Sequence, residues 1–377
     1  MKRRIFFCLV IPVVFALSCG DSDSSKNAPY TGPVEFTPLI ATATAPGSDV
    51  EVEVPSGLLM DVFIDGLSRK VVIGMLNLYF FLGSPDNSKD LSCSSPETFT
   101  YGAGQILYCP EENNIDVKTL DGAYQPLRSN ELKMASCHLP NWPTEAPPAI
   151  MGLSGNLTAK NRTGMTSVIE QLNPSYLSFS FPKGMTKSGF LQFDKLPEDA
   201  AAAFPQIPLV DPGILEFGYT ASPLRIEFYH KGKAHTILRN TEEGLLLETE
   251  SSIDRVADEF RVGFDTGTTL PIEVFEATPL LSSQVPRKAL NPESSASHYD
   301  RVLVVFEGES GEEILVDSGD LRLWIGNSPF DRVPTKASIP DNTQQVVILM
   351  GINFIGRFDF QFDFDGGRAT HITFVER

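Results

Sequence analysis

The sequence predicts an all-β fold with only a few short helices, divided into two parts. Many short segments alternate apolar and polar residues, which is the period of strands with one buried face. Glycine and proline, 29 and 28 residues, are spread along the chain rather than clustered, as expected for strands joined by turns. The chain of 377 residues exceeds the usual size of a single hydrophobic core, which favours two.

Residues 1–18 are expected to be a signal peptide and not part of the fold. A basic start, MKRR, precedes the short apolar run IFFCLVIPVVFAL, and ALSC ends it with small residues before Cys19. The segment resembles a bacterial lipoprotein signal, except that Ala16 stands where such signals usually have leucine. The resemblance implies cleavage before Cys19 and a lipid on its thiol. Ordinary secretion is the alternative.

The segment that follows, residues 19–46, begins with small and polar residues and contains prolines, which predicts a flexible tether. No later apolar run reaches the length of a membrane-spanning segment. A lipidated Cys19 implies a protein anchored in the cell envelope. The outer membrane is favoured, because the usual inner-membrane retention signal has aspartate directly after that cysteine and here Gly20 stands there.

The composition excludes some classes of function. The formal net charge is −18 and becomes −21 once the three positive charges of Lys2–Arg4 leave with the signal. Such an acidic surface repels phosphate backbones and argues against nucleic-acid binding. The five histidines are scattered and no CxxC or HxxxH pattern occurs, so no metal site and no cofactor is expected. Export permits one disulfide among Cys93, Cys109 and Cys137, and the sequence does not choose the pair.

The N-terminal part is expected over residues 47–196. DVEVEV alternates strictly, and two apolar runs are joined by an Asp65-Gly66 hairpin turn. TFTYGAGQILY predicts a second hairpin. MTSVIEQLN predicts a short helix that ends at Asn173-Pro174, and YLSFSF and GFLQF return to strand alternation.

Residues 197–212 are expected to cross to the C-terminal part, residues 213–377. That part ends with RFDFQFDFDGGRATHITF, in which four phenylalanines alternate with polar residues before the DGG turn and a last strand. Within it lies RVGFDTGTTLPIEVF, where Asp265-Thr-Gly-Thr interrupts two apolar runs.

The order of these features resembles the pepsin-type aspartic peptidases. In that family two lobes each supply an Asp-Thr-Gly loop, and an apolar segment ending in glycine threads under each loop. VGFDTGTTLPIEVF is similar to the second loop, and VVILMGINFIG to the segment under it, with Gly351 as the glycine. PPAIMGLSGN, with Gly152, is similar to the first threading segment. The resemblance covers roughly residues 50–377 and implies a bilobal pepsin-like acid protease fold with a cleft between the lobes.

The resemblance also implies the site residues. Asp265 corresponds to the second catalytic aspartate, and Thr266, Gly267 and Thr268 of its loop line the substrate cleft together with Gly74. FTYGAGQI resembles the flap hairpin and places Tyr101 and Gly102 over the substrate.

The first catalytic loop departs from the family pattern. Where its aspartate is expected, VVIGMLN has Gly74, followed by Met75 and Leu76. A competing alignment places Asp65 at the site, although a leucine then stands where the loop needs glycine. Nothing in the sequence requires Asp65 or Asn77 to replace the missing carboxylate. Asp317-Ser-Gly is similar to Asp265-Thr-Gly, but it is expected to be a turn at a strand end, since too few residues separate it from Gly351.

The chemistry of the family needs two carboxylates that share one proton, so that one activates water and the other polarises the scissile carbonyl. With Gly74 opposite Asp265, we expect a lipid-anchored pseudo-peptidase that binds a peptide or protein in its cleft without cutting it. One alternative is an active aspartic-type endopeptidase that uses Asp265 with Asp65. Another is a non-catalytic envelope scaffold. A monomer is expected.

Overall fold

The structure is a computed structural model, and it describes a defined set of residues to which the statements below refer. These are residues 30, 32–44, 51–77, 79–84, 93–101, 104–128, 131–138, 149–154, 166–182, 187–193, 204–211, 218–268, 272–277, 299–321 and 343–375. The predicted signal and Cys19 lie outside this set.

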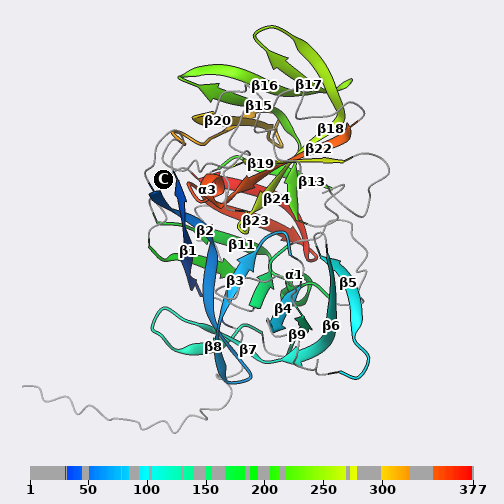
Figure 1. Ribbon diagram of the computed structural model, residues 1–377. Coiled ribbons are helices and arrows are strands. Elements are labelled where there is room, and N and C mark those ends of the chain that lie inside the picture. Colours follow the sequence, from blue (N-terminus) through cyan, green and yellow to red (C-terminus); the bar gives the residue numbers. More distant parts are fainter. Residues whose placement is uncertain are drawn as a thin grey trace, which may run out of the picture.

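The described chain is mostly β-strand, as the alternation predicts, and falls into two groups of strands (Figure 1). The first group contains β1 (Val34–Thr44), β2 (Glu51–Ile64), β3 (Leu67–Gly74), β4 (Phe80–Ser84), β5 (Glu97–Tyr101), β6 (Gly104–Asn113), β7 (Ile115–Lys118), β8 (Tyr124–Pro126), β9 (Leu132–His138), β10 (Ala149–Gly152), β11 (Tyr176–Ser180), β12 (Gly189–Phe193), β13 (Ile207–Val210), β23 (Asp359–Asp365) and β24 (Arg368–Val375).

The second group lies between β13 and β23 in the sequence. It contains β14 (Tyr219–Ala221), β15 (Pro223–His230), β16 (Lys233–Thr241), β17 (Gly244–Thr249), β18 (Ile253–Asp265), β19 (Ile272–Ala277), β20 (Arg301–Glu307), β21 (Glu313–Asp317) and β22 (Thr343–Gly351). Two short helices, α1 (Val168–Leu172) and α3 (Ile352–Ile355), occur in the described residues.

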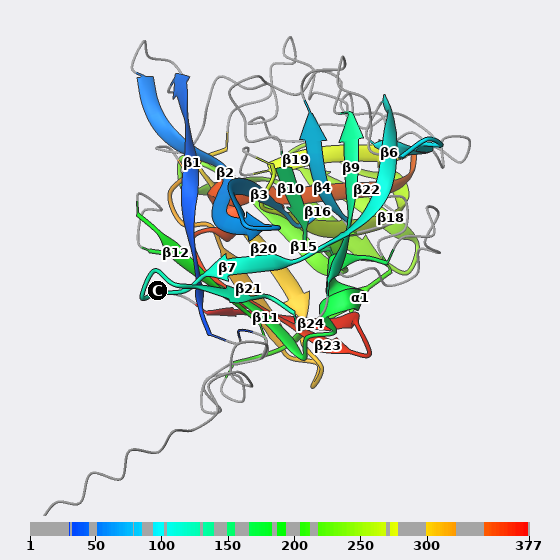
Figure 2. The same ribbon diagram turned by 90° about the horizontal axis from the view of Figure 1, so that it is seen from below.

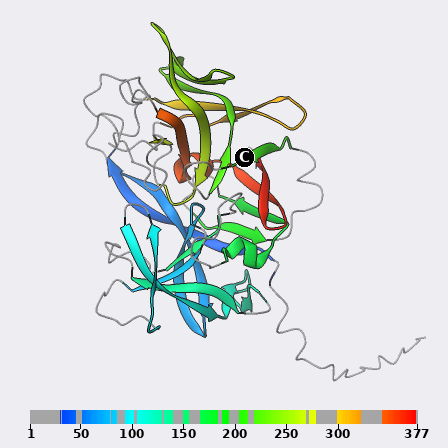
Figure 3. The same cartoon turned by 90° about the vertical axis from the view of Figure 1, so that its right-hand side faces the viewer.

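The last two strands connect the two groups. In Figure 3, β23 and β24 (red) lie between the blue-to-cyan strands and the green-to-orange strands. β23 pairs with β11 of the first group, and β13 pairs with both β24 and β14. The alternating phenylalanines of β23 contact both groups of strands. The Phe360 ring stacks on Phe179 of β11 with centroids 4.8 Å apart, and the Phe362 ring stacks on Tyr219 of β14 with centroids 3.9 Å apart. As a result one hydrophobic cluster runs through both groups.

The strand pairs of both predicted hairpins are confirmed, and so are the turn residues of the first. Asp65 and Gly66 both have positive φ, 46° and 80°, so they form the two-residue turn that joins β2 to β3 with Ile64 opposite Leu67. In the second hairpin β5 pairs with β6, with Tyr101 opposite Gly104. The predicted helix is α1, which ends at Asn173 in the left-handed conformation before Pro174.

One predicted boundary is corrected. The tether was expected over residues 19–46, but residues 34–44 form β1, which pairs with β12 and β2. The β12 partners of β1 lie more than 150 positions along the sequence, so the local composition did not indicate that pairing. The crossing was expected over 197–212, and within it Ile207–Val210 forms β13, which pairs with a strand of each group.

Each group contains a strand that ends in glycine and runs between one parallel and one antiparallel neighbour. In the first, β10 runs between β3, to which it is parallel, and β4, to which it is antiparallel (Figure 2). In the second, β22 runs between the parallel β18 and the antiparallel β19. Each middle strand ends in a glycine, Gly152 or Gly351, and these glycines pair in register with Gly74 and Asp265. The ends of β3 and β18 are therefore equivalent positions.

Candidate functional site

Asp265 ends β18 and is fixed by its own loop. The side chain is 5% exposed. Its Oδ1 accepts a hydrogen bond from the Gly267 N–H at 2.9 Å, and its Oδ2 accepts one from the Thr268 hydroxyl at 2.7 Å. An aspartate that bonds the N–H two residues later forms an Asx-turn. Glycine suits the third position because a Cβ on Gly267 would lie only 3.3 Å from Asp265 Oδ1. The loop holds the carboxylate in one orientation.

The loop of Asp265 contacts the end of β3 directly. The Thr266 hydroxyl, fully buried, donates to the Ile73 carbonyl at 3.0 Å, although the two residues are 193 positions apart. Ile73 precedes Gly74 and Thr266 follows Asp265. The covalent path through this hydrogen bond limits the distance between the Gly74 and Asp265 Cα atoms to about 12 Å. The structure thus brings these two predicted site residues together.

Further contacts join the same two regions beside β10. Here β10 and β22 are called the threading strands, because each passes close to one of the two loops. The Gly218 N–H donates to the Ser154 hydroxyl at 2.6 Å, and the Tyr219 hydroxyl donates to the Leu153 carbonyl. A Cβ on Gly218 would lie 2.7 Å from Leu76 Cδ2, so Leu76 packs directly on the Gly218 backbone. Sequence reasoning missed Ser154, Gly218 and Tyr219, because only their spatial partners give them a role.

The two loops differ in the chemistry of their corresponding residues. Gly74, Met75, Leu76 and Asn77 occupy the positions of Asp265, Thr266, Gly267 and Thr268 in the equivalent loop. Met75 is fully buried and carries no hydroxyl, so it cannot donate a hydrogen bond like that from Thr266 to Ile73. The contact between the loops is therefore asymmetric, and the first loop contributes no carboxylate at position 74.

Gly152 allows the threading strand to pass close to the first loop. A Cβ on Gly152 would lie 2.4 Å from the Asn77 carbonyl oxygen and 2.7 Å from the Tyr79 carbonyl oxygen. Backbone hydrogen bonds fix this crossing: Leu153 N–H donates to Gly74 O and Ser154 N–H to Asn77 O, both at 2.9 Å. Only a residue without a side chain fits here without a backbone shift.

Asp65 lies at the other end of β3, which corrects its candidacy as the second carboxylate. It is exposed, in the β2–β3 turn, and its Oδ1 accepts the Asn114 N–H at 3.0 Å. From Leu67 to Gly74 the strand spans about 23 Å. Asp65 lies in the turn beyond Leu67, so with Gly74 within about 12 Å of Asp265 the Cα atoms of Asp65 and Asp265 are more than about 11 Å apart. Two aspartates that share a proton need a Cα separation of about 10 Å or less.

Asp317-Ser-Gly forms a similar local turn in a different environment. Asp317 Oδ1 accepts the Gly319 N–H at 2.9 Å, as Asp265 does from Gly267. Here, however, Arg301 binds the carboxylate, with Nε 2.9 Å from Oδ1. The hydrogen bond from Arg301 lowers the pKa of Asp317 below its usual value. Asp317 is thus a surface ion pair, and the prediction of a strand-end turn is confirmed.

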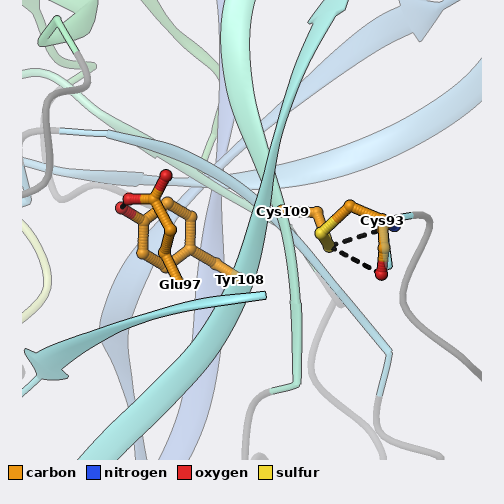
Figure 4. Close-up of a disulfide and its surroundings, with 4 residues drawn as sticks. All are labelled: Cys93, Glu97, Tyr108 and Cys109. Carbon is orange, nitrogen blue, oxygen red and sulfur yellow. Dashed lines mark hydrogen bonds between the residues drawn. A yellow bond between two sulfur atoms is a disulfide. The ribbon is translucent and has the colours of Figure 1, made fainter. Parts of the chain in front are cut away.

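The residues predicted to form a flap, Tyr101 and Gly102, are only partly described. Tyr101 ends β5 and pairs with Gly104 of β6, while Gly102 lies outside the described residues. The disulfide left open by the sequence joins Cys93 to Cys109, with the Cα atoms 5.7 Å apart (Figure 4). Next to Cys109, the Tyr108 hydroxyl donates to Glu97 Oε2 at 2.5 Å. The bridge therefore fixes the segment before β5 to β6, at the base of the hairpin.

Cys137 is the remaining thiol of the described chain. It is 1% exposed, and burial raises its pKa to about 12. A buried thiol of this kind is unreactive.

Within the described ranges, no group of three or more His, Cys, Asp or Glu side chains could hold a metal ion. The same residues contain no helix of sufficient length and apolar character to span a membrane.

Comparison of this chain with protein-family models and with curated proteins finds no match. The functional interpretation therefore depends on the geometry of the two loops.

Proposed function

We propose that this chain is a pepsin-fold pseudo-peptidase, anchored in the cell envelope by a lipid on Cys19, that binds an extended peptide or protein segment between its two loops without cleaving it. The single observation that carries the proposal is the pair of equivalent strand ends, joined by the Thr266–Ile73 hydrogen bond, at which one residue is Asp265 and the other Gly74.

Peptide hydrolysis of this type requires two chemical groups that act together. An aspartic peptidase uses a base to activate water and an acid to hydrogen-bond the scissile carbonyl, and the two carboxylates act as one unit. Asp265, oriented by Gly267 and Thr268, is suited to one of these roles. Gly74 can supply neither. Because members of a catalytic unit act together, loss of one removes most of the rate.

The same geometry supports retention of a binding role. The threading strands, the Asx-turn of Asp265 and the contacts between the loops hold the site in a fixed arrangement, and fixed sites bind with a smaller entropic cost. A peptide bound in the cleft of the proposed fold would lie across both strand ends.

The test uses the mature chain and three variants. An unfolded protein is incubated from pH 2.5 to 7 with the wild type, Asp265→Asn and Gly74→Trp. Asp317→Asn is the control, because Asp317 forms an equivalent Asx-turn away from the site. We expect no cleavage by any of them, and capture of peptides from a random library that is lost in Gly74→Trp and retained in Asp317→Asn.

Cleavage that disappears in Asp265→Asn and in the presence of a transition-state-mimicking inhibitor would overturn the proposal and make the chain an active endopeptidase. Absence of both cleavage and peptide capture would also overturn it and favour a scaffold.

A further inference from the structure

The space beside Gly74 is filled by a carboxamide. A Cβ built on Gly74 would lie 2.4 Å from Asn77 Nδ2 and 3.4 Å from Asn77 Cγ. The nearest atom of another residue is Cγ2 of Ile150, at an ordinary contact distance of 3.4 Å. The amide group of Asn77 therefore stands where the side chain of an aspartate at position 74 would begin.

Asn77 holds the position in its loop that Thr268 holds in the other. Each residue comes three positions after the strand end, at Gly74 or Asp265, and each carbonyl oxygen accepts an N–H of the segment that follows the threading glycine. The Ser154 N–H donates to Asn77 O at 2.9 Å, and the Ile352 N–H donates to Thr268 O at 2.8 Å. The Thr268 side chain turns toward Asp265 and bonds its Oδ2. The Asn77 side chain turns in the same way toward position 74, which has no side chain of its own.

The chemistry of an amide at this place differs from that of a carboxylate in one respect. Asparagine has nearly the shape of aspartate, but it is neutral, carries two N–H donors, and neither gains nor loses a proton over the physiological range. It can hydrogen-bond a carbonyl oxygen but cannot protonate it. Asn77 is partly exposed, so a ligand arriving from solvent can reach it, whereas Asp265 is almost fully buried.

We propose that the carboxamide of Asn77 takes the place of the missing carboxylate and donates its N–H to a backbone carbonyl of a bound extended peptide, opposite the Asp265 carboxylate. This rests on the proposed function of the site. The donor is permanent, so recognition of the carbonyl needs no shared proton, and no bond of the ligand is broken.

The placement of Asn77 is tested without a ligand. The mature chain is labelled with ¹³C at aspartate carboxyl groups, and the Asp265 signal, assigned by its loss in Asp265→Asn, is followed from pH 3 to 8. Asn77→Asp introduces a carboxylate of the same shape, and Asn114→Asp is a matched control on the exposed segment between β6 and β7. We expect Asp265 to titrate in two coupled steps separated by at least about one pH unit in Asn77→Asp, because like charges at one site cannot both ionise freely. Asn114→Asp should reproduce the wild-type curve.

The ligand part is tested with a peptide that carries a statine residue as probe. Asn77→Ala should weaken its binding about tenfold, the loss of one hydrogen bond between neutral groups. Wild-type binding should vary little between pH 5 and 7.5. The thermal unfolding midpoints of wild type and Asn77→Ala are compared to show whether weaker binding comes from unfolding. The isosteric Asn77→Asp is the second variant whose binding is measured.

The outcomes separate the two proposals. An Asp265 titration that is unchanged in Asn77→Asp, or probe binding that is equal in wild type and Asn77→Ala, overturns the role of Asn77 and leaves the proposed function standing. Coupled titration in Asn77→Asp, together with a wild-type chain that binds no probe and captures no peptide, supports the placement of Asn77 but overturns the ligand and the proposed function with it.

Discussion

The close crossing of the threading strand under the first loop predicts that alanine at two neighbouring glycines has very different costs. In Gly152→Ala, the new Cβ would lie 2.4, 2.5 and 2.7 Å from the Asn77 O, Asn77 C and Tyr79 O atoms, all of them backbone. Ordinary contacts of a Cβ begin near 3.4 Å, so the closest overlap is about 1.0 Å and the loop backbone must move. Overpacking of movable side chains costs about 1–3 kcal/mol, and we expect roughly 3 kcal/mol or more here.

Gly74→Ala meets an equally short contact but with a different atom. Its Cβ would lie 2.4 Å from Nδ2 at the end of the Asn77 side chain, which is partly exposed and can rotate away. Neither glycine has a positive φ, so alanine adds no backbone strain. It also lowers the entropy of the unfolded chain, which contributes about 0.4–1 kcal/mol in the opposite direction. The net change for Gly74→Ala should lie within about 1 kcal/mol of zero.

The assay is equilibrium unfolding in guanidinium chloride, followed by tryptophan fluorescence and by circular dichroism to check that the transition is two-state. A total stability of about 5–15 kcal/mol leaves room to resolve a 3 kcal/mol difference between the variants. Equal stabilities of Gly152→Ala and Gly74→Ala would refute the described crossing, because then both positions would face either movable atoms or backbone.

Four other consequences follow from contacts of the described residues. Thr266→Val should lower the stability by about 1–3 kcal/mol because it leaves the buried Ile73 carbonyl without its hydroxyl donor, and Thr266→Ser should restore most of this in the same unfolding assay. Replacement of both Cys93 and Cys109 by serine should cost up to about 3 kcal/mol, since the bridge closes a loop of separation 16, and stability insensitive to dithiothreitol would contradict the bridge. Cys137 should resist iodoacetamide at pH 8 in the native protein, because burial raises its pKa to about 12. The contribution of its protonated thiol to stability is full below pH 9 and is lost as the pH rises toward 12. Cys137→Ala should lack this loss of stability at alkaline pH. Asp317→Asn should lower the stability by roughly 0.5–1 kcal/mol at pH 7. Because Arg301 lowers the pKa of Asp317, this difference in stability from the wild type should vanish as the pH falls below about 4. Peptide capture by Asp317→Asn should be unchanged throughout.

The candidate site could be predicted from the sequence only in part. Asp265-Thr-Gly-Thr and Asp317-Ser-Gly both form Asx-turns with the glycine N–H, so the local motif specifies the turn at both places. What distinguishes them is the neighbour, an arginine on the adjacent strand for Asp317 and the end of β3 for Asp265. The neighbour of Asp265 is 193 positions away, and that of Asp317 lies on the preceding hairpin strand, so neither is part of the three-residue motif.

Gly74 and Asn77 illustrate the same limit. The sequence indicated that the carboxylate was missing from VVIGMLN and left open whether Asp65 or Asn77 replaces it. The register of β2 with β3 places Asp65 at the end of β3 opposite to Gly74. The turn after Gly74 places the Asn77 amide next to Gly74.

The sequence by itself determined the local features: the β-rich class, the Asp65-Gly66 hairpin, the end of α1 at Asn173, and the alternating strand β23, because period, turn chemistry and caps act within a few residues. Only the tertiary structure decided that residues 34–44 form a strand, that Cys93 pairs with Cys109, and that Asp265 lies close to Gly74 and well apart from Asp65. These depend on contacts between residues up to 193 positions apart, whose energy exists only once both loops are packed on their threading strands.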